Sequence, residues 1–587
     1  MGNSVGEWTG PPQKGVAAYS STNTLLGNTA GAPYSECGFA TFSRMNTRRR
    51  DLLKYSPLAL SAFASPAANA QPANLHASES PLFFDVKRYG ATGTGKNLDS
   101  PGVNAAIDAA VAAGGGTVVF PAGTYLCFSI RLKTNVHLYL SQGATILAAA
   151  SPLPGQTTGE LGGVYDAAGP RTSYDSYQDY GHNHWHNSLI WGEDIHDTGI
   201  SGPGLIYGKG LSFGAWRDGD IRGNYPSYRA EQAGVGNKAI ALKNCRNVTF
   251  RDFSILKGGH FGLLLTGVDN LTIDNLTIDT DRDGMDIDCC KNVHVSNCTV
   301  NSPWDDGICP KSSFALGYAR ATENVTITGC TVTGYYQLGT VIDGTYKIFP
   351  ESENVYRTGR IKCGTESNGG FKNITISNCI FEGCNSLSLE SEDGALCEDI
   401  TISNISMRNL IYGPLFFRLG ARLRGPKEST RVGALRRILV SNIVSYNSAA
   451  SIGNILSGVP GYPIQDIKIA NFYMQHKGGV GTEQARVVPP EQIDKYPDPG
   501  MFGPMPAQGF FLRHLRNLEL SHVEIAPMAN DARPSFVLED VTRADFFAVT
   551  APTEPPAFAL RVAKDVRIQF SRAAADAVIE TATNKIH

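Results

Sequence analysis

The sequence predicts an all-β protein built as a single-stranded parallel β-helix with a short N-terminal capping helix. Three observations carry this prediction: a five-residue strand motif that recurs from residue 248 onward, a spacing near one coil between neighbouring copies, and a helix-and-strand block ahead of them. Apolar residues alternate in the motif at period two, so each copy is a strand with one buried face. Stacked copies bury a continuous core, which lets a chain of 587 residues fold without separate cores.

The block at residues 81–150 has the pattern of a cap followed by the first coils. Ser100 and Pro101 suit an N-cap and a first helical position, and we expect a short helix from Val103 to Ala113. Three glycines end it, and the strand Thr117–Phe120 follows. A solenoid needs such a cap because its first coil would otherwise expose an apolar end. The block resembles the N-terminal cap of right-handed, pectin-lyase-like β-helix enzymes, which implies a right-handed β-helix.

Residues 151–240 are less regular and rich in Gly, Tyr, His, Asp and Trp, which predicts coils with long loops. Loops inserted on one face of a solenoid commonly build its binding surface. Their aromatic side chains could stack on sugar rings or pack the loops against the protein body, and the sequence does not choose between the two. These side chains are Tyr174, Tyr177, Tyr180, Trp185 and Trp216.

The repeat occupies residues 241–545, which we expect to form the catalytic coils, and residues 546–587 are expected to finish the stack. The clear copies are Val248–Asp252, Leu271–Asn275, Val293–Asn297, Val325–Gly329, Ile374–Asn378 and Ile400–Asn404, and the weaker ones are Ile438–Asn442, Ile467–Asn471 and Leu518–His522. The last position is most often Asn, which tolerates left-handed backbone and can hydrogen-bond to stacked neighbours.

The spacing of these copies separates a β-helix from its main rival. Steps of 23 and 22 residues link Asp252, Asn275 and Asn297 and approximate one coil. Longer steps carry inserted loops or an extra coil. An immunoglobulin-like array would instead show antiparallel turns about every 8–12 residues.

Charge and hydropathy exclude two classes of partner. The formal net charge is −3 and no basic stripe extends beyond Arg48–Arg50, so we expect no nucleic acid. No apolar run reaches the roughly 18 residues of a membrane span. We expect a monomer that acts on a polysaccharide or oligosaccharide.

The N-terminal region has the pattern of an export signal. Residues 47–54 resemble a twin-arginine motif, a short apolar segment follows from Tyr55 to Ala67, and Ala68-Asn69-Ala70 suits a cleavage site. We therefore expect a signal peptide at residues 45–70 and a periplasmic or secreted protein. Residues 1–44 do not suit a signal, so they are either a disordered extension or a segment upstream of a true start at Met45.

Cysteines and acidic runs give no sign of a metal or a disulfide scaffold. Cys298, Cys330 and Cys379 occupy the same place in the repeat, where a small buried hydrophobe suffices. Residues 279–284 resemble the start of an EF-hand loop, but Cys290 stands where the twelfth-position Glu is needed. The sequence therefore predicts no metal site and no cofactor.

Two groups of carboxylates lie one coil apart. Asp283 precedes Asp305 and Asp306 by 22 and 23 residues, the same step as between successive repeat strands. Coils stack about 4.8 Å apart, so all three can face one cleft. Glycosidic hydrolysis needs one carboxyl that donates a proton and one that acts on water, and crowding raises the pKa of one member. A single Asp beside Gly is more often a turn residue, but two groups at coil spacing favour a site.

These residues carry a family resemblance. Asp281 to Asp286, followed by Asp305-Asp306-Gly307-Ile308-Cys309-Pro310-Lys311-Ser312, resembles the first two signatures of glycoside hydrolase family 28, the polygalacturonases and rhamnogalacturonases. The resemblance implies inverting hydrolysis of α-glycosidic bonds, with Asp305 as general acid and with Asp283 and Asp306 positioning and activating water. Lys311, in the second signature, is then expected to bind substrate.

The family's third and fourth signatures are displaced. The third, Gly-His-Gly, falls on Gly359–Thr365, which has no histidine, and the fourth, Arg-Ile-Lys, would fall on Ser388–Glu390. Arg360 and Lys362 lie two apart on one strand, hence on one face. Two interpretations stay open. In the first, Arg360 and Lys362 bind a uronate carboxylate of the substrate together with Glu390 and Arg418. In the second, Arg360 and Lys362 form structural ion pairs with Glu390 and Glu366.

Three functions remain at this point. The first is an exported hydrolase of a pectin-type galacturonide or rhamnogalacturonide, acting from within or from an end of the chain. The second is a polysaccharide lyase on the same fold, which needs calcium or an Arg/Lys base. The third is a non-catalytic carbohydrate-binding β-helix.

Overall fold

The computed structural model describes residues 83–178, 181–212, 232–348 and 357–587. The predictions for residues 1–44 and 45–70, with the alternative start at Met45 and the export signal, lie outside the described residues. The described residues belong to one compact unit, Ala77–His587. Within them, no helix combines the length and apolarity needed to cross a membrane.

The cap and first coils contain β1 (Phe83–Asp85), β2 (Thr94–Leu98), α1 (Ser100–Ala112), β3 (Gly116–Phe120), β4 (Gly123–Cys127), β5 (Ile130–Arg131), β6 (Val136–Leu140) and β7 (Ala144–Ala148). The next coils contain β8 (Ile190–Glu193), β9 (His196–Ser201), β10 (Leu205–Tyr207), β11 (Lys238–Lys243), β12 (Arg246–Arg251), β13 (Ser254–Leu256), β14 (Phe261–Thr266), β15 (Asp269–Asp274), β16 (Thr277–Asp279), β17 (Asp283–Asp288), β18 (Lys291–Ser296), β19 (Thr299–Asn301), β20 (Ile308–Lys311), β21 (Thr322–Thr328) and β22 (Thr331–Thr333).

After the hairpin β23 (Tyr336–Leu338) and β24 (Lys347–Ile348), the stack continues with β25 (Lys362–Cys363), β26 (Phe371–Ser377), β27 (Ile380–Glu382), β28 (Leu387–Ser391), β29 (Leu396–Arg408), β30 (Leu415–Leu419), β31 (Ala434–Ser448), β32 (Asn454–Ser457), β33 (Ile464–His476), α2 (Thr482–Ala485), β34 (Phe510–Pro527), β35 (Phe536–Phe547), β36 (Phe558–Gln569) and β37 (Ala577–Ile586).

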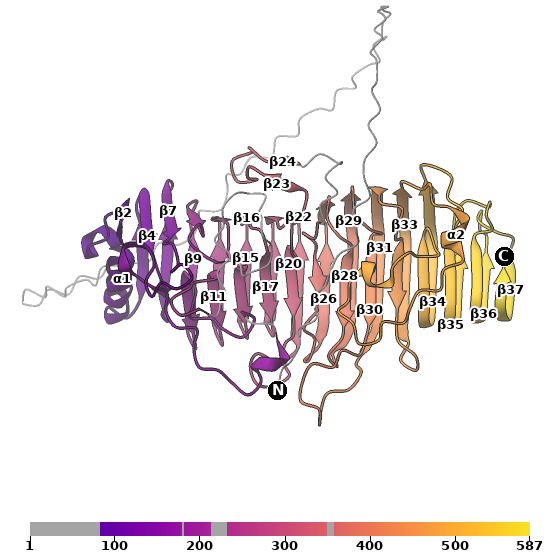
Figure 1. The fold of residues 1–587 in the computed structure, drawn as a ribbon, viewed down its shortest axis with the longest axis horizontal. Helices are drawn as coiled ribbons and strands as arrows, with labels where there is room; N and C mark the ends of the chain where they lie inside the picture. Colours follow the sequence, from indigo (N-terminus) through magenta and orange to yellow (C-terminus); the bar gives the residue numbers. More distant parts are fainter. Residues whose placement is uncertain (1–82, 179–180, 213–231, 349–356) are drawn as a thin grey trace, which may run out of the picture. The chain divides into compact units, whose positions relative to one another are not determined.

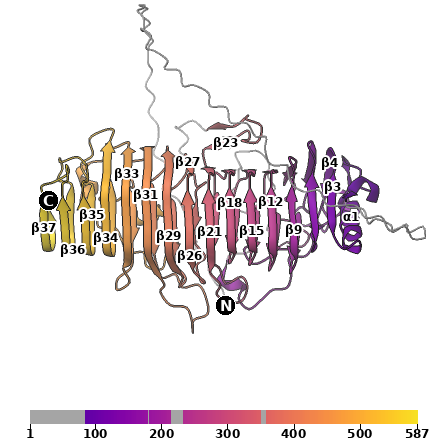
Figure 2. The same ribbon diagram turned by 180° about the vertical axis from the view of Figure 1, so that it is seen from behind.

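Strands at the same place in successive coils pair in parallel, which confirms the predicted right-handed parallel β-helix. One run of neighbours is β12, β15, β18, β21 and β26, in unbroken register, and Figure 2 shows these strands side by side. A second, six-stranded sheet has the order β20-β17-β14-β11-β8-β5, and Figure 1 labels its strands β20, β17 and β11. Because pairing skips no coil, the long steps in the repeat are inserted loops and not extra coils.

The asparagines that end the repeat form the predicted ladder. Asn442 Nδ2 donates to Asn404 Oδ1 at 2.9 Å, and Asn471 Nδ2 donates to Asn442 Oδ1 at 3.0 Å. All three have positive φ, which Asn adopts more readily than most residues. Inside the coils, Cys298, Cys330 and Cys379 are buried free thiols, as expected from their place in the repeat.

The cap differs from the prediction at the start of its helix. α1 begins at Ser100, so Ser100 is the first helical residue and Asp99 takes the N-cap position. The Ser100 hydroxyl instead accepts a hydrogen bond from the Phe128 amide at 2.8 Å and ties the helix to the first coil. At the other end, β37 pairs antiparallel with β36 and so ends the parallel stack.

Candidate active site

Two successive coils carry the predicted catalytic residues to one place, and the next coil adds Arg360. The amide of Gly284 donates to Asp306 O at 2.9 Å, and the amide of Gly307 donates to Arg360 O at 2.8 Å. A Cβ on Gly284 would come 2.4 Å from Gly307 O, so only glycine allows the coils to approach this closely. Asp283, Asp306 and Arg360 therefore follow one another along the stack.

The carboxylates of Asp283, Asp305 and Asp306 lie together. Each contributes an oxygen to a group of atoms that all lie within 4.8 Å of one another. Asp283 and Asp306 are buried, whereas the Asp305 side chain is 20% exposed. We call these three residues the aspartate cluster. The coil spacing correctly predicted that they meet, and their individual roles stay a prediction.

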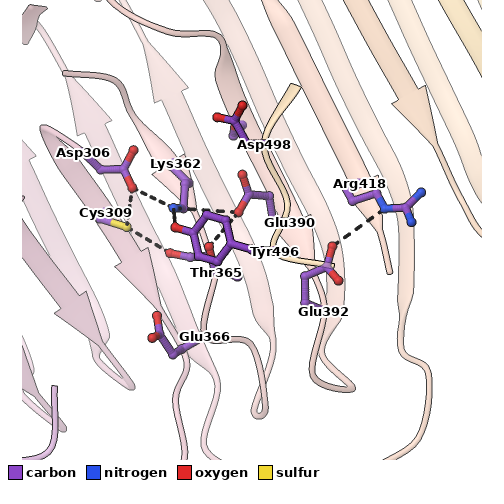
Figure 3. Close-up of polar contacts among 12 residues, drawn as sticks. Asp306, Cys309, Lys362, Thr365, Glu366, Glu390, Glu392, Arg418, Tyr496 and Asp498 are labelled. Atoms are coloured by element: carbon purple, nitrogen blue, oxygen red, sulfur yellow. Dashed lines mark hydrogen bonds and ion pairs between the residues drawn. The ribbon is translucent and has the colours of Figure 1, made fainter. Parts of the chain in front are cut away.

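Asp306 is held as an anion by two cations. Arg360 Nε lies 2.8 Å from Asp306 Oδ1, and Lys362 Nζ lies 2.7 Å from Asp306 Oδ2 (Figure 3). Burial alone would raise the pKa of Asp306, but Lys362 and Arg360 outweigh it and hold the pKa well below its ordinary value. Both cations also lie near Glu390: Arg360 Nη2 is 3.6 Å from Glu390 Oε1, and Lys362 Nζ is 3.8 Å from Glu390 Oε2.

Asp283 has the opposite electrostatics. Burial and the neighbouring charges of Asp286 and Asp305 raise the pKa of Asp283 well above its ordinary value, and Lys311 only partly opposes them. Asp305, the exposed member, contacts Arg282 Nη2 at 2.9 Å and accepts from the Asp306 amide at 3.0 Å. The cluster thus combines a buried carboxyl that keeps a proton with a neighbour fixed as an anion, as acid/base chemistry requires.

A segment far along the chain lies over this site. Residues 477–509 connect β33 to β34, and we call them the strap. Tyr496 OH lies 3.3 Å from Lys362 Nζ, and Asn385 Nδ2 donates to Asp498 at 3.4 Å. Figure 3 shows the Tyr496 ring beside Lys362 and Glu390. The strap therefore lies next to the cations that hold Asp306.

Comparisons with known proteins match two parts of the chain. Residues 147–336, which include the aspartate cluster, match the model of glycosyl hydrolases family 28, and residues 83–157 match that of rhamnogalacturonase A/epimerase, pectate lyase-like. We call the matched residues 147–336 the family 28 region. The predicted enzyme class, a glycosidase, is the class of this family.

Relatives of the chain are distant or partial. A segment of 138 residues, 20% of this chain, is 33% identical to mannuronan C5-epimerase AlgE2 of Azotobacter vinelandii but spans only 14% of that protein. A probable polygalacturonase of Vitis vinifera is 21% identical over 65% of this chain and 72% of its own length. The family 28 exopolygalacturonase structure of Yersinia enterocolitica, at 16% identity, matches with a TM-score of 0.53 over 79% of this chain and 78% of its own, which supports the fold.

The displaced basic pair lies outside the family 28 region but directly beside its carboxylates. Ile361 bridges Ile308, and Lys362 pairs with Ser388, so Arg360 and Lys362 occupy the coil between Asp306 and Glu390. Both are buried, with 2% and 1% exposure, and both contact Glu390, as the structural interpretation predicted. That interpretation is wrong for Glu366, which contacts Lys311 and His182.

The other predicted substrate-binding cations are also enclosed. Lys311 Nζ lies 3.2 Å from Glu366 and 3.7 Å from Asp286 beneath the cluster. Arg418, further along the stack, donates from Nη2 to the carbonyl oxygens of Glu491 and Gln492 at 3.0 and 2.9 Å and so anchors the strap. Their contacts are with protein groups, and binding of substrate by either stays a prediction.

Sequence reasoning missed several residues of the site. His182 and His260 lie against Asp283, and Arg282 contacts Asp305. Of the two roles left open for the aromatic residues, the described ones pack the loops: Tyr174 and Tyr177 contact Phe314, and Trp185 is buried. Tyr180 and Trp216 lie outside the described residues. The richness of residues 151–240 in His was a signal for His182 alone, since His260 and Arg282 lie beyond that range.

Asp286 gives the family 28 region a testable pH dependence. Burial raises the pKa of Asp286 from its ordinary value near 3.8 to about 7, against the attraction of Lys311. Between these two pKa values the Asp286 carboxyl is ionised in the unfolded chain but protonated in the folded protein. The free energy of unfolding therefore decreases as the pH rises through this range. Asp286→Asn should therefore flatten the pH dependence of the free energy of unfolding between pH 4 and 7, measured by denaturant titration. An unchanged slope would contradict this account of Asp286.

Proposed function

We propose that this protein hydrolyses α-glycosidic bonds of a pectin-type polysaccharide or oligosaccharide, a galacturonide or rhamnogalacturonide, by inversion. The observation that carries the proposal is the aspartate cluster, which joins a proton-holding carboxyl and a fixed carboxylate within 4.8 Å. The family 28 region around it and the polygalacturonase relative support the substrate class.

The three carboxyls divide the work according to their exposure and charge. Asp305 is the exposed member, so it can reach the glycosidic oxygen and donate the proton to the leaving group. Asp283 keeps a proton in the free protein and can supply Asp305 across the cluster. Asp306 stays ionised and immobile between Arg360 and Lys362, where it can orient the attacking water.

The charges next to Asp306 favour an acidic sugar. Burial raises the pKa of Glu390 despite its two cationic neighbours, whereas the pKa of Asp306 is lowered. Glu390 therefore balances the charges of Arg360 and Lys362 less fully than Asp306 does. A uronate carboxylate at this end of the cleft would add a further counter-charge for these two cations.

The same charges disfavour the lyase alternative. A lyase on this fold would need a neutral Lys or Arg to remove a proton from the sugar ring. Although burial opposes the charge on Lys362, Asp306 and Glu390 raise the pKa of Lys362 well above its ordinary value, so its amine stays protonated. Arg360 is bound to the same carboxylates.

A panel of substrates tests the proposal. We expect the protein to shorten polygalacturonate or rhamnogalacturonan, or oligomers of either. The size of the first products then distinguishes cleavage at an end of the polysaccharide from cleavage within it. Proton NMR of those products should show the anomeric configuration opposite to that of the bond cleaved. Binding without any product would instead support the non-catalytic β-helix, and a retained configuration would refute inversion.

We also propose export through the twin-arginine pattern of residues 47–54. N-terminal sequencing of the protein recovered outside the cytoplasm should give Gln71 as the first residue. An intact segment before Ala70 in the exported protein would refute the cleavage.

A further inference from the structure

Two histidines that the proposed hydrolysis does not use lie beside Asp283. His260 immediately precedes β14, where Phe261 pairs with Asp283 of the next coil, and its amide donates to Asn237 O at 2.8 Å. His182 belongs to the loop before β8. The His260 ring stacks on Phe261 at 4.3 Å, and His182 meets the edge of the same ring at 4.8 Å. Phe261 thus positions both imidazoles.

The ring nitrogens of these histidines point to a ligand. One nitrogen of each lies with an Asp283 oxygen in a group of atoms within 4.8 Å of one another. His260 and His182 are only 8% and 7% exposed, and among the described residues His260 Nε2 has no hydrogen-bond partner. Buried polar atoms without partners are costly and uncommon in folded proteins.

We propose that His182, His260 and Asp283 bind one divalent transition-metal ion of the zinc class. Two imidazoles and one carboxylate suit zinc, which often takes three protein ligands and leaves a fourth position open. Calcium and magnesium prefer oxygen ligands throughout. Tetrahedral zinc ligands lie about 3.4 Å apart, so rotation of the side chains would have to bring the three atoms together by little more than 1 Å.

A neighbouring carboxylate orients one of the ligands. Glu366 Oε1 lies 3.2 Å from His182 Nδ1, which leaves Nε2 for the ion, as in carboxylate–histidine–zinc arrangements.

An ion at this site would compete with hydrolysis, a consequence that rests on the proposed function. Coordination by the metal would occupy the Asp283 carboxyl and remove it from the aspartate cluster. We therefore expect zinc to inhibit the hydrolase. Substitutions of His182 or His260 that abolish zinc binding should make the remaining hydrolase activity of the variant insensitive to zinc.

The binding test needs no activity. Full-length, untagged protein is treated with a chelator, dialysed against Zn²⁺ and analysed for bound metal, and Co²⁺ is used in parallel because its visible absorption reports tetrahedral coordination. His260→Phe keeps the stacking on Phe261 and should lose one bound ion together with the cobalt spectrum, as should His182→Phe. His186→Gln is the matched control, because His186 pairs with Glu193 in the same loop region and stands outside the site.

Equal metal content in the wild type and in both phenylalanine variants, or no binding by the wild type, would overturn the proposal. Circular dichroism and thermal melting establish whether each phenylalanine variant is folded. If one variant does not fold, the metal content of the other variant decides the test. A protein that binds zinc in this way but cleaves no pectin-type substrate would refute the proposed function and leave the metal site standing.

Discussion

Asp305→Asn should lower turnover of the preferred pectin-type substrate by several orders of magnitude and leave the protein folded. The amide cannot donate the proton that the leaving oxygen needs, and general acid catalysis alone contributes about 10²–10⁴-fold. Asp305 is partly exposed and its main charged contact is the single ion pair with Arg282, so its loss should cost little stability. Initial rates and the thermal midpoint of the same preparation measure both effects.

Asp274→Asn is the matched control for this substitution. Asp274 ends β15, in the coil of Asp283, but it contacts Ser296 and Asn297 on the outer side of the stack. It should keep near wild-type activity. If Asp305→Asn retained most of its activity, or lost it only through unfolding, the assignment of Asp305 as the acid would be wrong.

Asp306→Asn should behave differently, because it should lose both activity and stability. Removing one partner of a buried ion pair leaves the other charges without compensation and costs about 3–5 kcal/mol. Here two buried cations, Arg360 and Lys362, would lose their closest carboxylate. Denaturant titration of the purified variant, with turnover measured on the folded fraction, separates the two losses.

A double variant tests the physical cause of that instability. Asp306→Asn with Lys362→Met removes one uncompensated cation, so it should recover part of the free energy of unfolding without recovering turnover. A single Asp306→Asn variant as stable as the wild type would show that Arg360 and Lys362 do not depend on Asp306. A double variant less stable than the single one would point to the same conclusion.

The aspartate cluster could be predicted because a solenoid converts sequence spacing into position. Asp283 and Asp305 stand one coil apart in a regular part of the repeat, and parallel pairing of β17 with β20 brings them together. The asparagine ladder and the buried cysteines followed from the same periodicity. Local chemistry was less reliable at Ser100, where a hydrogen bond to Phe128 replaced the expected capping role.

The residues that sequence reasoning missed reach the site from irregular segments. Arg360 was predicted to bind substrate, but it is 54 positions from Asp306, and the loop between them hid that the two lie on adjacent coils. Tyr496 is 134 positions from Lys362 and comes from the strap. His182 lies in a loop without a repeat pattern. Periodicity says nothing about where such loops fold, so their contribution needs the three-dimensional structure.

The most direct test of the central claim follows the oxygen of water into the product. The protein is incubated with its preferred pectin-type substrate in heavy-oxygen water, and the reaction is stopped before reducing ends exchange with solvent. Mass spectrometry should then find saturated products with one heavy oxygen at each new reducing end, and none with Asp305→Asn. Unsaturated products without the label, or no cleavage of any pectin-type substrate, would contradict hydrolysis by the aspartate cluster.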